Sequence, residues 1–356
     1  MATESVLAII GGRKRHAKKR SEQIDLQLKQ WRRDQNGDLR ILVLGPSRSG
    51  KSTLIKQMEI SYEGISDADR ERYKPVILGG IVESMRSIIT AGSESLDHDD
   101  LRPHAQTVLN SPEQAHLDTV CPETRAAIEL LWADERVQHY FGQYRQENGS
   151  SYTSMDYFFG NLARITSSDY SPTDQDILHT HVETLGIRET TLNIRPALRV
   201  RVSEVGTHHR GEGLFKGIHY FDDARTILIM VPLSSYFELG TDKAQPNRLD
   251  EARRTLTSLV ESKWFEGEEK RIVLVFNEVD KFKEMLPRHP LADFFPDYEG
   301  GEGYKEACQF IAGTFTQRTE RRLDVYYCCA TDVASMEPIS QMVIDSTIPT
   351  FRMGSG

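Results

Sequence analysis

The sequence predicts an α/β protein: a mostly parallel sheet with helices on both faces, and an all-helical domain inserted into it. Three observations lead to this fold class. A phosphate-loop motif lies between an expected strand and an expected helix at residues 41–58. Apolar residues at helical spacing then recur over a long stretch, about 62–175. From residue 187 onward, strands of the buried type alternate with helical segments, as in parallel sheets covered on both faces.

Composition sets the broad class. The chain has 356 residues and the composition of a soluble globular protein. No apolar run reaches the length of a transmembrane helix. Its four cysteines show neither zinc-ligand spacing nor a disulfide framework, so we expect a cytoplasmic protein. The formal net charge of −9 argues against nucleic acid as a partner.

The N-terminal segment is basic. Residues 13–20 read Arg-Lys-Arg-His-Ala-Lys-Lys-Arg and open a stretch with few Gly or Pro residues, so we expect a basic helix over residues 1–38. Two interpretations of the run remain open. It forms a patch for an anionic membrane surface or an acidic partner, or it is a solvated helix face or a localisation signal.

The phosphate loop reads Gly-Pro-Ser-Arg-Ser-Gly-Lys-Ser-Thr over residues 45–53. Backbone N–H groups in such a loop surround phosphate oxygens, and the helix N-terminus adds partial positive charge. We expect Lys51 to lie between the outer phosphates and the Ser52 hydroxyl to bind Mg²⁺. The other loop residues expected to bind nucleotide are Gly45, Arg48, Ser49, Gly50 and Thr53.

The expected helical domain covers residues 62–179, between two parts of the sheet domain at 39–61 and 180–356. Its apolar residues recur at helical spacing around 76–89, 126–141 and 155–165, without a strand-like alternation. The alternative is a set of core helices within one domain. The length of the stretch favours a separate inserted domain.

Strands are expected at 191–194, 198–202, 226–231, 272–276 and 325–329, with helices at about 247–263, 303–319 and 335–346. Ligands of parallel sheets bind at the carboxyl ends of the strands. The phosphate loop, Asn277 and the pair Cys329-Ala330 all follow expected strands. We therefore expect them to meet at one site.

Asn277 and Asp280 suit a purine pocket. A carboxylate can accept two N–H hydrogen bonds from the N1 and 2-amino edge of guanine, and adenine lacks these donors. The backbone N–H of Ala330 could donate to guanine O6. The alternative is an ordinary strand-end turn, because Asn and Asp favour turns.

Together these residues resemble the alpha subunits of heterotrimeric G proteins, from about residue 24 to residue 348. Matching blocks also lie at 170–178, 184–187, 218–221, 247–249, 263–265 and 329–332. The resemblance implies a Ras-like P-loop GTPase domain with a mostly parallel six-stranded sheet and an inserted all-helical domain. It further implies GTP or GDP and Mg²⁺ as cofactors, and a beta-gamma dimer and a G protein-coupled receptor as partners.

The resemblance also implies residue roles. Thr184 would be the second protein ligand of Mg²⁺, in switch I, and Ser154 would contact phosphate from the helical domain. Further nucleotide contacts are expected at Leu178, Gly206 and Cys329.

The sequence departs from the family at the catalytic positions. The family Arg three residues before the switch I Thr is His181, and a second family Arg is His179. Switch II of the family reads Asp-x-Gly-Gly-Gln, whereas residues 204–208 read Glu-Val-Gly-Thr-His. The water-orienting Gln is thus His208, and the Gly whose N–H meets the γ-phosphate is Thr207.

Two further departures lie in the nucleotide loops: the acidic residue of the family's phosphate loop is Arg48, and the Lys of Asn-Lys-x-Asp is Glu278. In such GTPases an arginine finger contributes roughly 10³–10⁵ in rate. A histidine supplies comparable charge only when protonated. We therefore expect a slow signalling GTPase, with His181 and His208 in the catalytic positions. The alternative is a non-hydrolysing guanine-nucleotide-binding scaffold, and an ATPase or kinase is disfavoured by Asn277 and Asp280.

Both ends of the chain differ from the family as well. Ala2 and Thr3 replace the usual acylation sites, so no N-myristoylation is expected, and attachment to the inner face of the plasma membrane would depend on residues 13–20. Pro349 interrupts the C-terminal helix that would meet a receptor. The glycine-rich segment 209–217 lacks the family's beta-gamma-docking residues, which weakens that expected contact.

Overall fold

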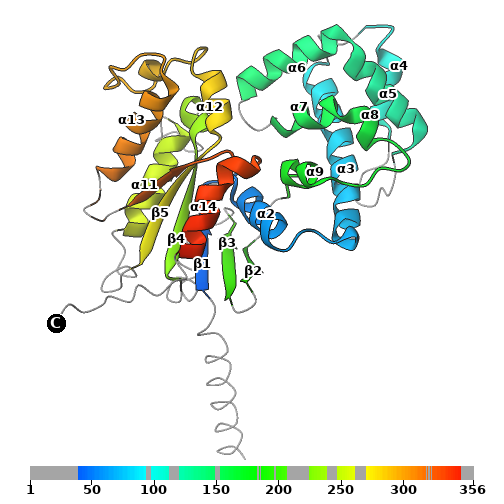
Figure 1. The fold of residues 1–356 in the computed structure, drawn as a ribbon. Helices are drawn as coiled ribbons and strands as arrows, with labels where there is room; N and C mark the ends of the chain where they lie inside the picture. Colours follow the sequence, from blue (N-terminus) through cyan, green and yellow to red (C-terminus); the bar gives the residue numbers. More distant parts are fainter. Residues whose placement is uncertain are drawn as a thin grey trace, which may run out of the picture.

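The computed structural model describes residues 39–93, 98–111, 120–148, 153–182, 184, 186–195, 198–206, 224–238, 247–260, 270–317, 319, 321 and 323–345 (Figure 1). The expected basic helix over residues 1–38 lies outside this set. So do Thr207, His208 and the tail that contains Pro349.

A six-stranded sheet forms the centre of the nucleotide-loop domain, with the strand order β2-β3-β1-β4-β5-β6. All neighbouring strands are parallel except the antiparallel pair β2 and β3. This agrees with the mostly parallel sheet that the sequence predicts. The strands are β1 (Leu39–Leu44), β2 (Ile187–Arg195), β3 (Leu198–Val205), β4 (Thr226–Pro232), β5 (Arg271–Asn277) and β6 (Asp324–Tyr327).

The two faces of the sheet follow from the alternation of side chains along each strand. On β1, Leu42 and Leu44 pack on one face and Ile41 and Val43 on the other. The first face is covered by α11 (Arg248–Val260), α12 (Val279–Met285) and α13 (Tyr304–Thr316). The second face is covered by α2 (Lys51–Tyr62) and α14 (Val333–Asp345).

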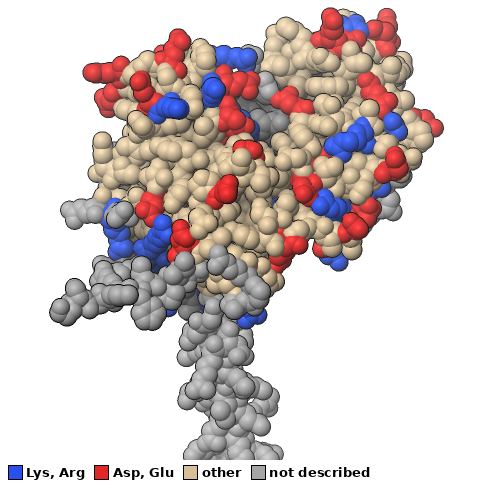
Figure 2. Space-filling view, in the orientation of Figure 1, with Lys and Arg blue, Asp and Glu red and all other residues tan. Residues whose placement is uncertain are grey.

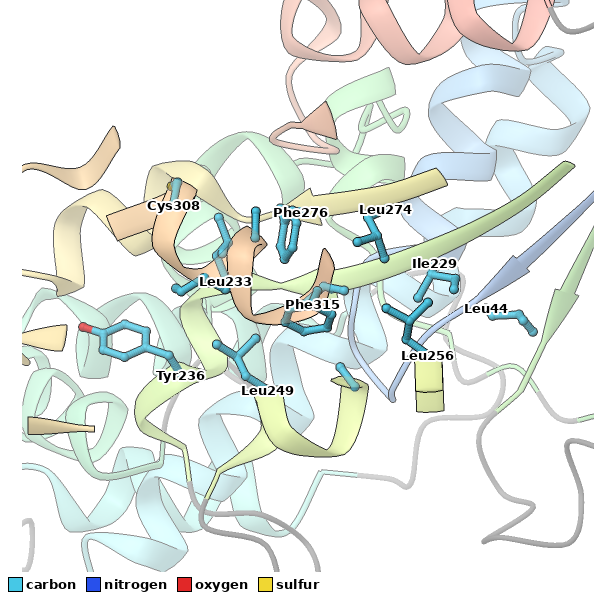
Figure 3. Packing of buried hydrophobic residues seen from close by; sticks show 14 of the residues in the cluster. Leu44, Ile229, Leu233, Tyr236, Leu249, Leu256, Leu274, Phe276, Cys308 and Phe315 are labelled. Carbon is cyan, nitrogen blue, oxygen red and sulfur yellow. The ribbon is translucent and has the colours of Figure 1, made fainter. Parts of the chain in front are cut away.

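Figure 3 shows the packing on the first face, where apolar side chains from β1, β4 and β5 meet those of α11 and α13. Phe276 and Phe315 pack edge to face, with ring centroids 5.3 Å apart. Two short 3-10 helices, η3 (Leu233–Phe237) and η5 (Leu291–Asp293), extend this layer. This core fixes the carboxyl end of β5, where the expected purine residues begin.

The inserted helices gather beside the sheet domain (Figure 1), and they share a separate hydrophobic core. Its long element is α3 (Asp67–Ala91), whose N-terminus is capped by Ser66. The other helices are α4 (Arg102–Leu109), α5 (Pro122–Ala133), α6 (Glu135–Asn148), α7 (Thr153–Gly160) and α8 (Leu162–Ile165). No strand occurs among the described residues of this region, as expected.

Helix α9 (Asp174–His179) joins the helical domain to the sheet domain. Asp176 closes a capping box with Thr173 and binds Arg164 through two hydrogen bonds of 2.7 and 2.9 Å. From α2, the buried Lys56 donates to the carbonyl oxygens of Ile177 at 3.1 Å and Thr180 at 2.7 Å. Helix α9 and Thr180, which lead into the segment with His181, are therefore held both by the helical domain and by α2.

The structure differs from the expectations in detail. β3 continues to Val205, three residues beyond the expected end, because its last residues pair with β1 and β2. β6 ends at Tyr327, before Cys328 and Cys329. Val76, counted among the apolar helix residues, is 41% exposed. Among the described residues, no helix combines the length and the apolar character needed to cross a membrane.

Candidate nucleotide-binding site

A cavity of about 420 Å³ lies between the carboxyl edge of the sheet and the helical domain. It is bordered by the phosphate loop, by α7 and α9, and by the loops after β5 and β6. Figure 2 shows acidic and basic side chains over α12, beside the hollow that separates it from the helical domain. The sequence-predicted residues that line the cavity are Arg48, Ser49, Gly50, Lys51, Ser52, Thr53, Ser154, Leu178, His181, Asn277, Asp280, Cys329 and Ala330.

The phosphate loop needs its two glycines. Gly45 has φ +147°, and a Cβ there would lie 2.4 Å from the carbonyl oxygen of Met230. Gly50 has φ +91°, and a Cβ there would lie 2.1 Å from Asn277 Nδ2. Arg48 also adopts a left-handed conformation, at φ 58°, which is uncommon for a residue with a side chain. The loop is thus held in a tight turn against β4 and β5.

Lys51 points back into its own loop, where its Nζ donates to the carbonyl oxygens of Gly45 at 3.0 Å and Pro46 at 2.8 Å. Burial lowers the pKa of Lys51 to about 8, opposed by the charge of Glu204 and assisted by that of Arg248. Because a phosphate anion would stabilise the ammonium, these features suit a phosphate-binding lysine. Nearby, the fully buried Ser49 Oγ has no hydrogen-bond partner.

At the other side of the loop, two hydroxyls and one carboxylate come together. Ser52 Oγ donates to Glu204 Oε1 at 2.5 Å, and Thr184 Oγ1 donates to the same oxygen at 3.0 Å. The second carboxylate oxygen, Glu204 Oε2, is buried without a partner. Oxygen donors of this kind, with an unsatisfied buried carboxylate oxygen among them, fit Mg²⁺.

Glu204 was not among the sequence-predicted site residues. It lies near the end of β3, beside Val43 of β1, and is 1% exposed. The signal that could have found it is a carboxylate two residues after the strand expected at 198–202, at the first position of the block 204–208 that resembles switch II.

Gly206 lies next to the Thr184 segment. Its N–H donates to the carbonyl oxygen of Gly186 at 2.7 Å, and a Cβ at Gly206 would lie 2.1 Å from the carbonyl oxygen of Thr184. The cavity lining does not include Gly45, Thr184 or Gly206. These residues lie in the segments that shape the site.

Asn277 ties three loops together at the purine end. Its Nδ2 donates to the carbonyl oxygen of Ser49 at 3.1 Å, and its Oδ1 accepts from the N–H of Ala330 at 2.9 Å. Cys328 Sγ also donates to Oδ1, at 3.6 Å. The Asn277 side chain is therefore a brace between loops. Because the Ala330 N–H already donates to Asn277 Oδ1, it could donate to a base only by sharing its hydrogen between the two acceptors. Asp280 is exposed in the cavity and presents a carboxylate to it.

Glu278 lines the cavity, but its carboxylate is hydrogen-bonded within the protein. It begins α12 in a left-handed conformation, at φ 64°. Its carboxylate accepts hydrogen bonds from the Ser234 hydroxyl and from Lys281 Nζ, the latter at 2.7 Å. Lys281 lines the cavity. A cation thus remains at this end of the site although the family Lys is replaced.

The two histidines after α9 have different surroundings. His179 stacks on Tyr157, with ring centroids 3.9 Å apart and an interplanar angle of 9°. Burial, with a smaller contribution from Lys281, lowers the pKa of His179 to about 4, so that this ring is neutral at pH 7. His181 is exposed and lines the cavity. His208 and Thr207 lie outside the described residues.

The phosphate loop and the Asn277 brace at the carboxyl edge of a mostly parallel sheet, with a helical insert, define a P-loop protein. A family model described as "G-protein alpha subunit" matches residues 18–347. The guanine nucleotide-binding protein subunit alpha of Cryphonectria parasitica is 38% identical over 341 residues, which cover 94% of this chain and 95% of the relative. The corresponding alpha-1 subunit of Neurospora crassa is 38% identical over 342 residues, with the same coverage. The chain belongs to the G-protein alpha subunit family, which confirms the resemblance drawn from its motifs.

Proposed function

We propose that this chain binds GTP and GDP in the cavity between its two domains and acts as a slow signalling GTPase. One observation carries the proposal. The cavity brings the phosphate loop and the Asp280 carboxylate together, and Asn277 joins the loops that hold them. A phosphate chain at one end and a guanine base at the other match this arrangement.

In this proposal the phosphate loop binds the phosphates through its N–H groups and through Lys51. Asp280 accepts from the N1 and 2-amino groups of guanine, which discriminates against adenine because an unpaired carboxylate is costly. Ser154 and Leu178 close the cavity from α7 and α9. We propose domain limits of 39–61 with 180–356 for the sheet domain and 62–179 for the inserted domain.

Mg²⁺ would be held by Ser52 and Thr184, with Glu204 beside them. When bound, it would neutralise phosphate charge and align the terminal phosphate. The protein's own part in hydrolysis would fall to His181, which lines the cavity, and to His208. A neutral histidine donates one hydrogen bond and lacks the permanent charge and the forked donors of arginine. We therefore propose weak stabilisation of the charge that develops on the phosphoryl group, and slow turnover.

The test is single-turnover release of phosphate from protein preloaded with γ-³²P-labelled GTP. The proposal predicts full labelling by GTPγS in Mg²⁺ and phosphate release at least about tenfold slower than that of an alpha subunit with the Arg and Gln intact. Release at the rate of such a subunit would contradict slow turnover. No labelling by GTPγS would contradict the binding proposal itself.

A second candidate is a guanine-nucleotide-binding scaffold that does not hydrolyse GTP. The neutral, stacked state of His179 favours it, because this ring supplies no charge to the cavity at pH 7. Stoichiometric GTPγS binding without any phosphate release over hours would select the scaffold. Measurable release that depends on His181 would select the GTPase.

By family membership we further propose a beta-gamma dimer and a G protein-coupled receptor as partners, and a peripheral position at the inner face of the plasma membrane that depends on residues 13–20. The residues that would make these contacts lie largely outside the described part of the chain. Gel filtration of the GDP-bound chain with a purified beta-gamma dimer tests the first of these. Co-elution would support it, and separate elution would count against it.

A further inference from the structure

A second cavity lies inside the helical domain, with a volume of about 460 Å³. Side chains of α3, α4, α5 and α6 line it, together with Ser93 after α3 and Leu101 before α4. In the described part of the chain, none of the residues that line it also lines the nucleotide-binding cavity. A guanine nucleotide therefore does not account for this second cavity.

The floor of the second cavity is apolar and belongs to the core of the helical domain. Met85, Leu131 and Val137 line it and are 0%, 2% and 1% exposed. Protein interiors rarely leave voids larger than a water molecule, and an apolar void holds water poorly. The volume falls within the range of about 300–1,000 Å³ that is typical of sites for small organic molecules. The floor therefore favours an apolar ligand over water.

The rim of the second cavity is polar and exposed. Thr90, Ser93, Arg102 and Gln106 form it. Hydroxyl, amide and guanidinium groups all donate hydrogen bonds, whereas a carboxylate only accepts them. Among the described residues, no Asp or Glu lines this cavity. The rim therefore suits a ligand whose polar end is a carboxylate better than one whose polar end is an amine.

The acids nearest the rim already have partners. Arg102 binds Asp99 at 2.9 Å, and the two side chains are 49% and 95% exposed. An ion pair this exposed contributes little to stability, so Arg102 can exchange Asp99 for the carboxylate of a ligand at small cost. Asp100 and Asp134 both bind Arg136, at 2.6 Å each.

We propose that the helical domain binds a medium-chain fatty carboxylate, with its hydrocarbon chain in the second cavity and its carboxylate at Arg102 and Gln106. The hydrocarbon chain fills a space that is apolar and poorly hydrated, and the carboxylate stays at the exposed rim. This site is independent of the proposed guanine-nucleotide site, because the two cavities are lined by different residues.

The experiment is isothermal titration calorimetry of the full chain with dodecanoate, below the concentration at which dodecanoate forms micelles. We expect binding at one site with a dissociation constant in the micromolar range. The heat-capacity change should be negative, because apolar surface is buried. Decanoate, which is shorter by two methylene groups, should bind about tenfold more weakly. Dodecylammonium has a similar chain and the opposite charge, and it should bind more weakly than dodecanoate.

Two variants, each with a matched control, test the position of the site. Ala105→Phe puts a ring into the cavity and should weaken dodecanoate binding about tenfold or more. Ala68→Phe, at an exposed position near the other end of α3, should leave it unchanged. Arg102→Gln removes the charge at the rim and should weaken binding about fivefold. Arg72→Gln is its control, because Arg72 pairs with Asp69 at the same sequence separation and the same 2.9 Å distance.

Three results would overturn the proposal: no saturable binding of dodecanoate to the wild type, equal affinity for decanoate and dodecanoate, or wild-type affinity in folded Ala105→Phe protein. The comparison of chain lengths uses the wild type alone, so it decides the matter even if Ala105→Phe does not fold. GDP binding is measured separately, and dodecanoate should leave it unchanged. A chain that binds dodecanoate in this manner and does not bind GDP would contradict the proposed function and support this inference.

Discussion

Asn277 Nδ2 donates a hydrogen bond of 3.1 Å to the backbone carbonyl oxygen of Ser49, so the end of β5 is fastened directly to the phosphate loop. The same amide accepts from the N–H of Ala330 with its oxygen. One side chain that is 3% exposed therefore sets the spacing between the loops expected to bind phosphate and base. In the proposed function, Asn277 would therefore affect nucleotide binding by positioning these loops.

The first prediction concerns this brace. Asn277→Ala leaves a buried carbonyl and a buried N–H without partners, each at a cost of about 1–3 kcal/mol. We expect a lower melting temperature and weaker binding of fluorescent GDP, by about tenfold or more. The exposed Asn110→Ala is the control and should leave both quantities unchanged within error. Wild-type GDP affinity in Asn277→Ala would show that the brace is dispensable.

The second prediction concerns the choice of base. Asp280→Ala removes the carboxylate that would accept from the 2-amino group, so the preference for GDP over inosine diphosphate should fall to about unity. In the wild type we expect a preference of about tenfold or more, because inosine lacks that amino group. Competition against fluorescent GDP measures both values. Asp297→Ala, at an exposed position, should retain the wild-type preference.

The third prediction concerns the catalytic position. His181→Arg puts a permanent, forked cation at the cavity wall, and we expect faster single-turnover GTP hydrolysis, with a ceiling of about 10³-fold to 10⁵-fold. His181→Lys, a point charge without the fork, should give a smaller gain. If both variants hydrolyse GTP at the wild-type rate, the slow step lies elsewhere, and His181 is not the limiting position.

The fourth prediction is a pH dependence. The pKa of His179 is lowered to about 4 by burial, so the unfolded chain binds more protons than the folded chain between about pH 4 and pH 6.5. The free energy of unfolding therefore rises with pH across this window. Because of His179 it should be about 1–2 kcal/mol lower at pH 5 than at pH 7. His179→Phe preserves the stack on Tyr157 and removes the titration. Urea unfolding at pH 5 and pH 7 should show a smaller difference for this variant than for the wild type, and an equal difference would contradict the assignment.

Much of the fold could be predicted because its signals are local. The glycine-bounded motif at 45–53 specifies the phosphate loop, and the uninterrupted apolar residues of β4 and β5 identify buried parallel strands. Asn277 and Ala330 could be assigned to one site because each follows a strand expected from the sequence. The rule that ligands bind at the carboxyl ends of parallel strands was sufficient for that.

The remaining features depend on contacts between distant segments. Glu204 joins Ser52 only because β3 pairs with β1 in the register that sets Glu204 beside Val43. The state of His179 depends on the ring of Tyr157, which comes from another helix. Val76 has the pattern of a core residue, yet it is exposed and lines the cavity between the domains. Periodicity reports which face of a helix is apolar, and it does not report which part of that face meets a cavity.

Equilibrium binding of fluorescent GDP to the purified, folded chain in the presence of Mg²⁺ tests guanine-nucleotide binding most directly. We expect saturable binding at micromolar concentration or below, with displacement by unlabelled GTP and GDP and none by ATP at similar concentration. Absence of binding at micromolar GDP, or equal displacement by ATP, would contradict it.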